Sequence, residues 1–98
     1  MSQHKKARWL LTYDIADPRR LGRMFRFLKK QGVPVQYSVF LLEVSAHEMN
    51  QLLPQMAKII HPQADDVRAY CLPANLWQAT LGKAILPEGS LPTQEFLK

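Results

Sequence analysis

One aspartate stands out as a residue that could do chemistry. It is Asp14, in the stretch LLTYDIADPRR at residues 10–20. A carboxylate inside an otherwise apolar strand is costly unless a partner group or a metal ion accompanies it. A single carboxylate cannot hold Mg²⁺, because this ion needs several oxygen ligands in near-octahedral geometry. In a two-fold dimer whose axis passes near the end of this strand, two copies of Asp14 face each other. We therefore predict that one Mg²⁺ ion is shared by the two Asp14 carboxylates of a homodimer, with water and a substrate phosphate as further ligands.

Other catalytic arrangements find little support in the sequence. The histidines at 4, 47 and 61 fit surface or helix-capping positions, and none neighbours a strand-end nucleophile. A Gly-rich phosphate loop, a Walker-type lysine motif and zinc-ligand spacing are absent from the sequence. The single cysteine, Cys71, excludes an internal disulfide, and its alternating apolar neighbours predict a small buried hydrophobe. We interpret Asp65 and Asp66 as loop residues.

A second candidate site is a row of cations on one face of a predicted helix. Asp17 is a typical N-cap, Pro18 suits the first helical position, and Gly32 with Pro34 beyond it predicts the end of the helix. The apolar face, which we expect to meet the core, contains Leu21, Met24, Phe25 and Leu28. The opposite face carries Arg19, Arg23, Arg26 and Lys30, flanked by Arg20 and Lys29.

We call Arg19, Arg23, Arg26 and Lys30 the basic ridge. Cations at these spacings make no i,i+4 ion pairs and repel one another, whereas a merely solvated helix face usually mixes signs. The pattern therefore favours contact with nucleic-acid phosphates, to which the flanking Arg20 would add. Charge distribution points the same way: residues 1–32 hold nine of the 13 Lys and Arg and two acids, whereas residues 33–98 hold four bases and six acids. Charge alone is equally consistent with a well-solvated surface.

The remaining elements predict a small α+β fold. The chain of 98 residues is 47% hydrophobic, which suits one domain with a core, and neither a signal peptide nor a membrane-spanning segment is evident, so we expect a soluble cytoplasmic protein. Strands are predicted at 8–15, 35–44 and 66–73. A capping box, Ser45 to Glu48, opens a helix that runs to His61 and that Pro54 should kink or split. Its apolar stripe contains Met49, Leu52, Leu53, Met56 and Ile60.

The order of these elements indicates helices on one face of an antiparallel sheet. If residues 35–44 contain two strands, the fold is a ferredoxin-like βαββαβ sandwich, although no turn signal shows where they divide. A helical turn at 74–79 and an extra C-terminal strand at 80–86 would follow. We predict that residues 1–86 form a nucleic-acid-binding domain and that 87–98 form an extended tail, either loose or docked on a partner chain.

Three segments, taken together, resemble the CRISPR-associated protein 2 family, the small dimeric subunit of the spacer-acquisition machinery. They are YDIADPRR at 13–20, GVPVQYSVF at 32–40 and ADDVRAYCLP at 64–73, with the basic helix between the first two. The resemblance implies a ferredoxin-like fold and a symmetric homodimer. It also implies that a C-terminal segment, here residues 81–97, extends the sheet of the partner protomer.

Individual positions carry over from the resemblance. Tyr13 and Asp14 match the strand-end motif of the catalytic site, and Ser38 and Phe40 match the second motif. Arg19, Arg20 and Arg23 fall where the family has the basic start of its helix. Pro34 departs from the pattern, since many members have a basic residue there. We interpret Phe40 as a packing residue, because an apolar Phe on a strand usually lies in the core.

The resemblance implies two functions, and a third interpretation stays open beside them. Members act as metal-dependent nucleases on RNA or DNA, with the aspartate that matches Asp14 binding Mg²⁺ at the dimer interface. Alternatively, the dimer is a non-catalytic scaffold that bridges integrase subunits and holds prespacer DNA along basic surfaces. The third interpretation is a small ribonuclease toxin on the same fold. We favour a spacer-acquisition subunit that binds DNA and has Mg²⁺-dependent endonuclease activity; the general base and the choice among RNA, single strand and duplex stay open.

Overall fold

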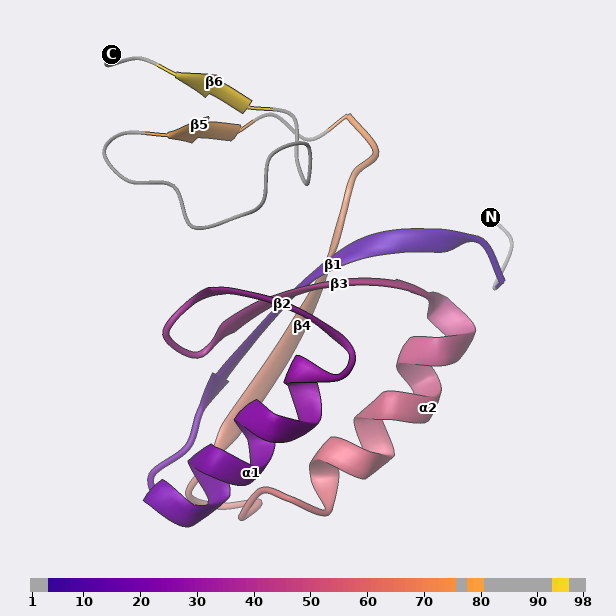
Figure 1. The fold of residues 1–98 in the computed structure, drawn as a ribbon. Coiled ribbons are helices and arrows are strands. Elements are labelled where there is room, and N and C mark those ends of the chain that lie inside the picture. The colour runs from indigo at the N-terminus through magenta and orange to yellow at the C-terminus, as the bar shows by residue number, and fades with distance from the viewer. Residues whose placement is uncertain (1–3, 76–77, 81–92, 96–98) are drawn as a thin grey trace.

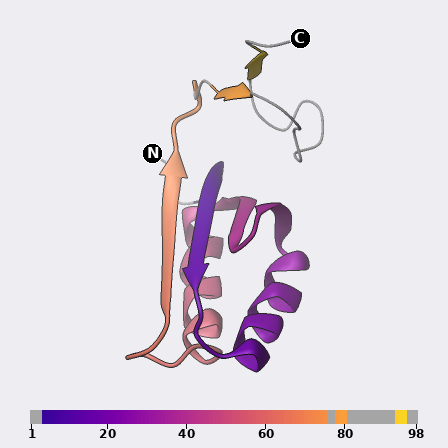
Figure 2. The same cartoon turned by 90° about the vertical axis from the view of Figure 1, so that its left-hand side faces the viewer.

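The computed structural model describes residues 4–75, 78–80 and 93–95 (Figure 1). The elements, in chain order, are β1 (Lys6–Asp14), α1 (Pro18–Lys29), β2 (Gly32–Gln36), β3 (Val39–Ser45), α2 (Ala46–Ala57), β4 (Asp66–Leu72), β5 (Gln78–Thr80) and β6 (Thr93–Glu95). The first four strands form an antiparallel sheet in the order β2-β3-β1-β4. Both helices cover the same face of this sheet (Figure 2). This arrangement confirms the predicted α+β, ferredoxin-like βαββαβ fold.

The strand predicted at 35–44 divides at Tyr37 and Ser38. Ser38 has φ of 61°, the left-handed conformation that non-glycine residues rarely adopt. Its carbonyl accepts a hydrogen bond from the Tyr13 N–H at 3.0 Å, which ties the turn to the end of β1. No sequence signal marks this turn, because neither residue is the Gly or Asn usual at such positions.

Both helix starts are confirmed. The Asp17 carboxylate accepts hydrogen bonds from the backbone N–H groups of Arg19 and Arg20. Ser45 and Glu48 form the reciprocal capping box of α2. Hydrogen bonds from the Lys6 ammonium and from the Ser45 N–H lower the pKa of Glu48 to about 2, so this cap is ionised at neutral pH.

The helix ends differ from the predictions. α1 ends at Lys29, and Gly32 is the first residue of β2, not a helix cap. A Cβ atom at Gly32 would lie only 2.3 Å from the Leu41 carbonyl oxygen, so glycine serves the close approach of β2 to β3. α2 ends at Ala57, before His61, and is not split at Pro54. Pro54 is exposed in the last turns of the helix, where water can satisfy the carbonyl group that lacks its donor.

The core lies between the helices and the sheet. Its fully buried side chains are Phe40, Leu11, Met24, Leu28, Leu42 and Met56. Leu21 and Phe25, which we expected in the core, are 38% and 40% exposed, because only the Met24–Leu28 edge of the helix faces the sheet squarely. Leu53 is likewise 39% exposed.

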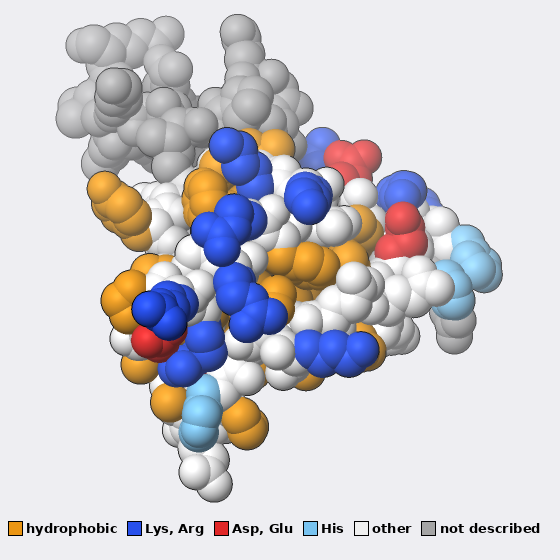
Figure 3. Space-filling view, turned by 60° about the horizontal axis from the view of Figure 1, so that its bottom comes forward, with side chains coloured by type: hydrophobic (Ala, Val, Ile, Leu, Met, Phe, Trp, Pro, Cys, Tyr) orange, Lys and Arg blue, Asp and Glu red, His pale blue; other side chains and the backbone are white. Residues whose placement is uncertain are grey.

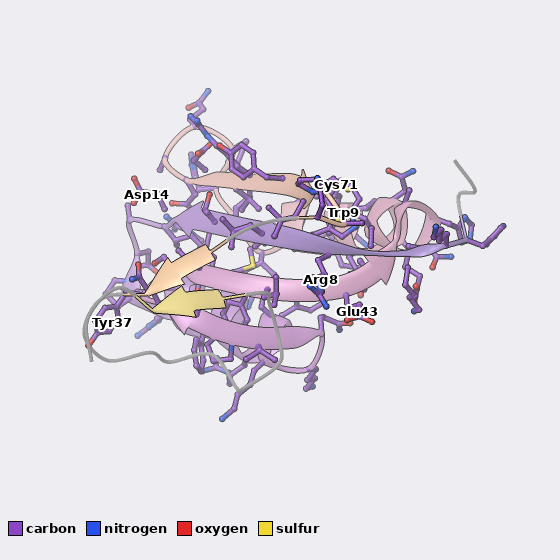
Figure 4. All side chains as sticks on the ribbon, turned by 90° about the horizontal axis from the view of Figure 1, so that it is seen from above. Arg8, Trp9, Asp14, Tyr37, Glu43 and Cys71 are labelled. Carbon is purple, nitrogen blue, oxygen red and sulfur yellow. The ribbon has the colours of Figure 1, made fainter. Side chains whose placement is uncertain are left out.

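The prediction that Cys71 is buried is wrong, since its side chain is exposed. Cys71 lies on β4, which is an edge strand of the sheet (Figure 4). In the register of β1 and β4 it stands opposite Trp9. The alternation in the sequence identified the face of the strand but could not show that the helices leave this edge uncovered.

The C-terminal elements form a separate unit of secondary structure. β5 and β6 pair in parallel and stand apart from the four-stranded sheet (Figure 1). Residues 74–75 form a turn, but Gln78 and Ala79 belong to β5, so the helical turn predicted at 74–79 is wrong in its second half. The strand predicted at 80–86 and the tail at 87–98 fall mostly outside the described residues.

The face of the sheet away from the helices carries a continuous apolar row. Strand register places Val33 opposite Leu41, Leu41 opposite Leu10, and Leu10 opposite Tyr70, so the row crosses β2, β3, β1 and β4. Tyr70 is 48% exposed and Val33 is 36% exposed. We call this surface the open face; Figure 4 looks onto it, with β5 and β6 in front.

Candidate nucleic-acid interface

Asp14 is the last residue of β1, and its side chain is exposed. The expectation of a carboxylate held inside an apolar strand was therefore wrong, because the strand ends at this residue. The register of β1 and β4 places Asp66 directly opposite Asp14, and strand alternation puts both on the open face. The Asp66 carboxylate accepts a hydrogen bond from Arg68 Nε at 2.8 Å, so its charge is partly balanced by a cation of its own strand.

The donors at this position match Mg²⁺ in kind but not in number. Carboxylate oxygens are the ligands that Mg²⁺ prefers, and Asp14 offers them to solvent. Across the described residues, however, no group of three or more His, Cys, Asp or Glu side chains gathers. The described part of one chain therefore does not present a complete set of protein ligands for this ion, and a Mg²⁺ site shared between two chains stays a prediction.

Tyr13 points to the opposite face from Asp14. Its side chain is 6% exposed, and its ring stacks on Phe40 with centroids 6.3 Å apart. Burial raises the pKa of the Tyr13 phenol, so the hydroxyl stays protonated at neutral pH and can only donate or accept a hydrogen bond. The structure thus does not bring the two predicted catalytic side chains together on one surface.

The two residues of the second motif, Ser38 and Phe40, both contact Tyr13 at the end of β1. Phe40 is 1% exposed and contacts Phe25 edge-on at 5.5 Å between centroids, which agrees with its interpretation as a packing residue. Ser38 occupies the turn whose carbonyl holds the backbone of Tyr13. The two motifs, separated in sequence, therefore meet at the end of β1, and Figure 4 places Asp14 and Tyr37 at this same end.

The basic ridge is exposed along α1. All four of its side chains are solvent-exposed, and Figure 3 shows Lys and Arg gathered in a band on this side of the molecule. The ion pairs found among the described residues are Lys6–Glu48, Arg20–Asp65 and Arg68–Asp66. None of them involves a ridge residue, so the ridge cations keep their charge unneutralised by any carboxylate in that part of the chain.

Arg20 differs from the ridge. Its guanidinium binds Asp65 through two hydrogen bonds, Nε to Oδ2 at 2.7 Å and Nη2 to Oδ1 at 3.1 Å. The Asp65 side chain is fully buried and also accepts hydrogen bonds from the N–H groups of Ala16 and His61. Arg20 first, then the two backbone N–H groups, hold the pKa of Asp65 well below its usual range. Asp65 lies in the loop before β4, as predicted, and serves there as a structural tether to which Arg20 is committed; Asp66, also predicted as a loop residue, is instead the first residue of β4.

Known proteins match this chain over most of its length. The family model described as "CRISPR associated protein Cas2" matches residues 7–80. The chain belongs to the Cas2 family. The "CRISPR-associated endoribonuclease Cas2 1" of Nitrosomonas europaea is 42% identical to it over 81 residues, covering 83% of this chain and 77% of that protein.

Solved structures agree with the Cas2 fold. Streptococcus pyogenes Cas2 superposes with a TM-score of 0.65 at 30% identity, over 69% of this chain and 88% of that one. A hypothetical protein from Thermus thermophilus gives a TM-score of 0.75 at 28% identity, over 85% and 99%. The predicted family is confirmed. Within the part of the chain that the structure describes, no helix is long and apolar enough to cross a membrane.

Proposed function

We propose that this chain is the small subunit of a CRISPR spacer-acquisition complex, in which a homodimer holds prespacer DNA along the basic ridges of its two α1 helices. The observation that carries the proposal is the ridge itself, an exposed row of cations that make no ion pair within the described residues. Phosphate groups bind such a row without reading sequence, and they release counterions as they do so.

The homodimer is supported by the open face. The two ends of the apolar row, Tyr70 at 48% and Val33 at 36% exposed, leave apolar side chains on the face of the sheet that carries no helix, whereas Leu41 between them is 8% exposed. A second copy stacked on this face about a two-fold axis would bury the row and place the two Asp14 carboxylates near each other. The integrase subunit would then bind outside this contact, so that one dimer bridges two of its copies.

The metal ion forms the second part of the proposal. One Mg²⁺ between the two Asp14 carboxylates would polarise a phosphodiester and activate a water molecule. The chain's own residues contribute the carboxylates, and the ridges hold flanking phosphates on either side. The buried, protonated Tyr13 supports the end of β1 from the opposite face.

A second candidate substrate is RNA. The N. europaea relative is named an endoribonuclease, and backbone contacts through the ridge do not distinguish RNA from DNA. An RNA-cleaving activity of the same Asp14 site is therefore the alternative to duplex binding as the principal role.

Charge reversal of the ridge tests the proposal. The triple variant Arg19→Glu/Arg23→Glu/Arg26→Glu should bind duplex DNA roughly 10³-fold more weakly in low-salt fluorescence anisotropy, and the slope of log K against log salt should fall by about 0.9 for each phosphate group that the variant no longer neutralises. Lys5→Glu, an exposed cation outside α1, is the control and should change affinity little. Unchanged affinity of the triple variant would contradict the assignment of the ridge.

Asp14→Ala separates binding from cleavage in the same assay. This variant should bind duplex DNA as the unaltered chain does and should lose Mg²⁺-dependent cleavage of DNA and RNA. Loss of spacer acquisition in cells together with an intact dimer would support a working metal site. Unchanged acquisition would make the dimer a scaffold in which Asp14 has no catalytic role.

A further inference from the structure

A groove lies between α1 and the β2–β3 hairpin, beside the basic ridge. Its volume of about 1100 Å³ lies just above the range typical of sites for small organic ligands. Leu21 and Phe25 of α1 line one wall, and Pro34, Val35 and Tyr37 of the hairpin line the other. None of the described acidic side chains lines it.

Three aromatic residues line this groove: the buried Tyr13 and the more exposed Tyr37 and Phe25. Tyr37 is 101% exposed, yet the left-handed Ser38 and the hydrogen bond from the Tyr13 N–H to the Ser38 carbonyl fix the backbone of its turn. Phe25 is 40% exposed and is held by its edge against Phe40, which lies in the core. Exposed aromatic rings on fixed backbone give contact area at little cost in conformational entropy.

Arg26 joins the groove to the basic ridge. It lines the groove and also the neighbouring hollow, which Arg23, Lys29 and Lys30 surround. Its guanidinium lies against Gly22, where an added Cβ would meet Nη1 at 3.2 Å. A small side chain at position 22 can be accommodated if this flexible guanidinium shifts by a few tenths of an ångström.

We propose that this groove seats unpaired nucleobases of a single strand whose phosphates follow the basic ridge. Charge complementarity selects this occupant: a polyanion bound to the ridge passes Arg26 and brings its bases to a groove with aromatic walls. Every base has a π-face, so stacking on Tyr37 and Phe25 tolerates any sequence. The inference rests on the proposed role of the ridge in holding phosphates, and it adds single-stranded ends to the duplex as ligand.

The test compares two labelled strands of equal length, oligothymidylate and a fully abasic strand, in fluorescence anisotropy with the full chain. Both carry the same phosphates, so a surface that binds by charge alone binds both equally. Each seated base should strengthen binding about 5- to 150-fold over the abasic strand. Equal affinity for the two strands would overturn the proposal.

Two pairs of variants locate the effect. Tyr37→Ala should remove most of the preference for the base-containing strand, and Tyr37→Phe, which keeps the ring, should preserve it. Gly22→Trp fills the groove without removing a charge and should abolish the preference, whereas Gly22→Ala should leave it nearly unchanged. Circular dichroism and thermal unfolding confirm that each variant is folded; if Gly22→Trp does not fold, the Tyr37 pair decides.

The outcomes separate the groove from the ridge. Weaker binding of the ridge variant to duplex DNA, without any preference for bases, would overturn the groove and keep the proposed function. A preference for bases that survives ridge charge reversal, with duplex affinity unchanged, would overturn the proposed function and leave base binding in place. If Tyr37→Ala and Gly22→Trp keep the preference but break the dimer or lose an integrase subunit, the groove is a protein-docking surface and the proposal fails.

Discussion

The two βαβ halves of the fold use helices of equal length for different purposes. α1 and α2 each contain 12 residues and cover the same face of the sheet. α2 contains no Lys or Arg, begins with a reciprocal capping box and buries Met49, Leu52 and Met56. α1 buries only Met24 and Leu28 and presents cations and half-exposed apolar side chains to solvent. Both helices thus anchor on the sheet through buried side chains, but only α1 also presents a row of cations to solvent.

The largest expected effect on stability is in α2. Met56 is 1% exposed, so Met56→Ala should lower the free energy of unfolding by about 2–5 kcal/mol, because it removes buried apolar surface and leaves a cavity. Leu21→Ala in α1 removes a side chain that is 38% exposed and should cost less than about 1 kcal/mol. Urea unfolding followed by circular dichroism measures both. Equal losses of stability would contradict the difference in burial between the two positions.

Asp65→Asn should have an intermediate effect that depends on pH. The pKa of Asp65 is lowered in the folded state, so its contribution to stability is present above the pKa of the unfolded chain, near 4, and is lost as the pH falls toward the lower folded value. The variant should therefore be less stable at pH 7, by less than Met56→Ala, and the difference should shrink at pH 2. Urea midpoints at the two pH values provide the measurement; a difference that stays constant would contradict ionic tethering of Arg20.

The smallest of the three effects concerns the α2 cap. Ser45→Ala removes the side-chain acceptor for the Glu48 N–H and should cost about 1 kcal/mol. Because α2 carries none of the ridge, duplex affinity should not change. Thermal unfolding and anisotropy on the same sample test both statements. A loss of affinity with Ser45→Ala would show that the helices do not divide these roles.

Local signals in the sequence predicted the elements well. Asp17, Pro18 and the Ser45 capping box are recognised from neighbouring residues, and the structure confirms them. The basic ridge follows from helical spacing alone, and its exposure agrees with that spacing. The fold class followed from the order of the elements, since the alternating strands and helices leave few topologies.

The features that the sequence did not reveal depend on contacts between distant residues. Gly32 looked like a helix end, but its role is set by the Leu41 carbonyl on the neighbouring strand. The importance of Asp65 rests on Arg20, 45 residues away. Periodicity indicated the inner face of α1 but not the width of the sheet beneath it, so Phe25 was expected in the core although it borders a groove.

The Asp65 carboxylate has a consequence for how the molecule moves. It binds Ala16 after β1, Arg20 in α1 and His61 after α2, so three chain segments end on one buried group. Local opening of any one segment leaves the carboxylate with unpaired oxygens and weakens its hold on the other two. We therefore expect fluctuations at the start of the basic ridge to be coupled to those of the segment after α2.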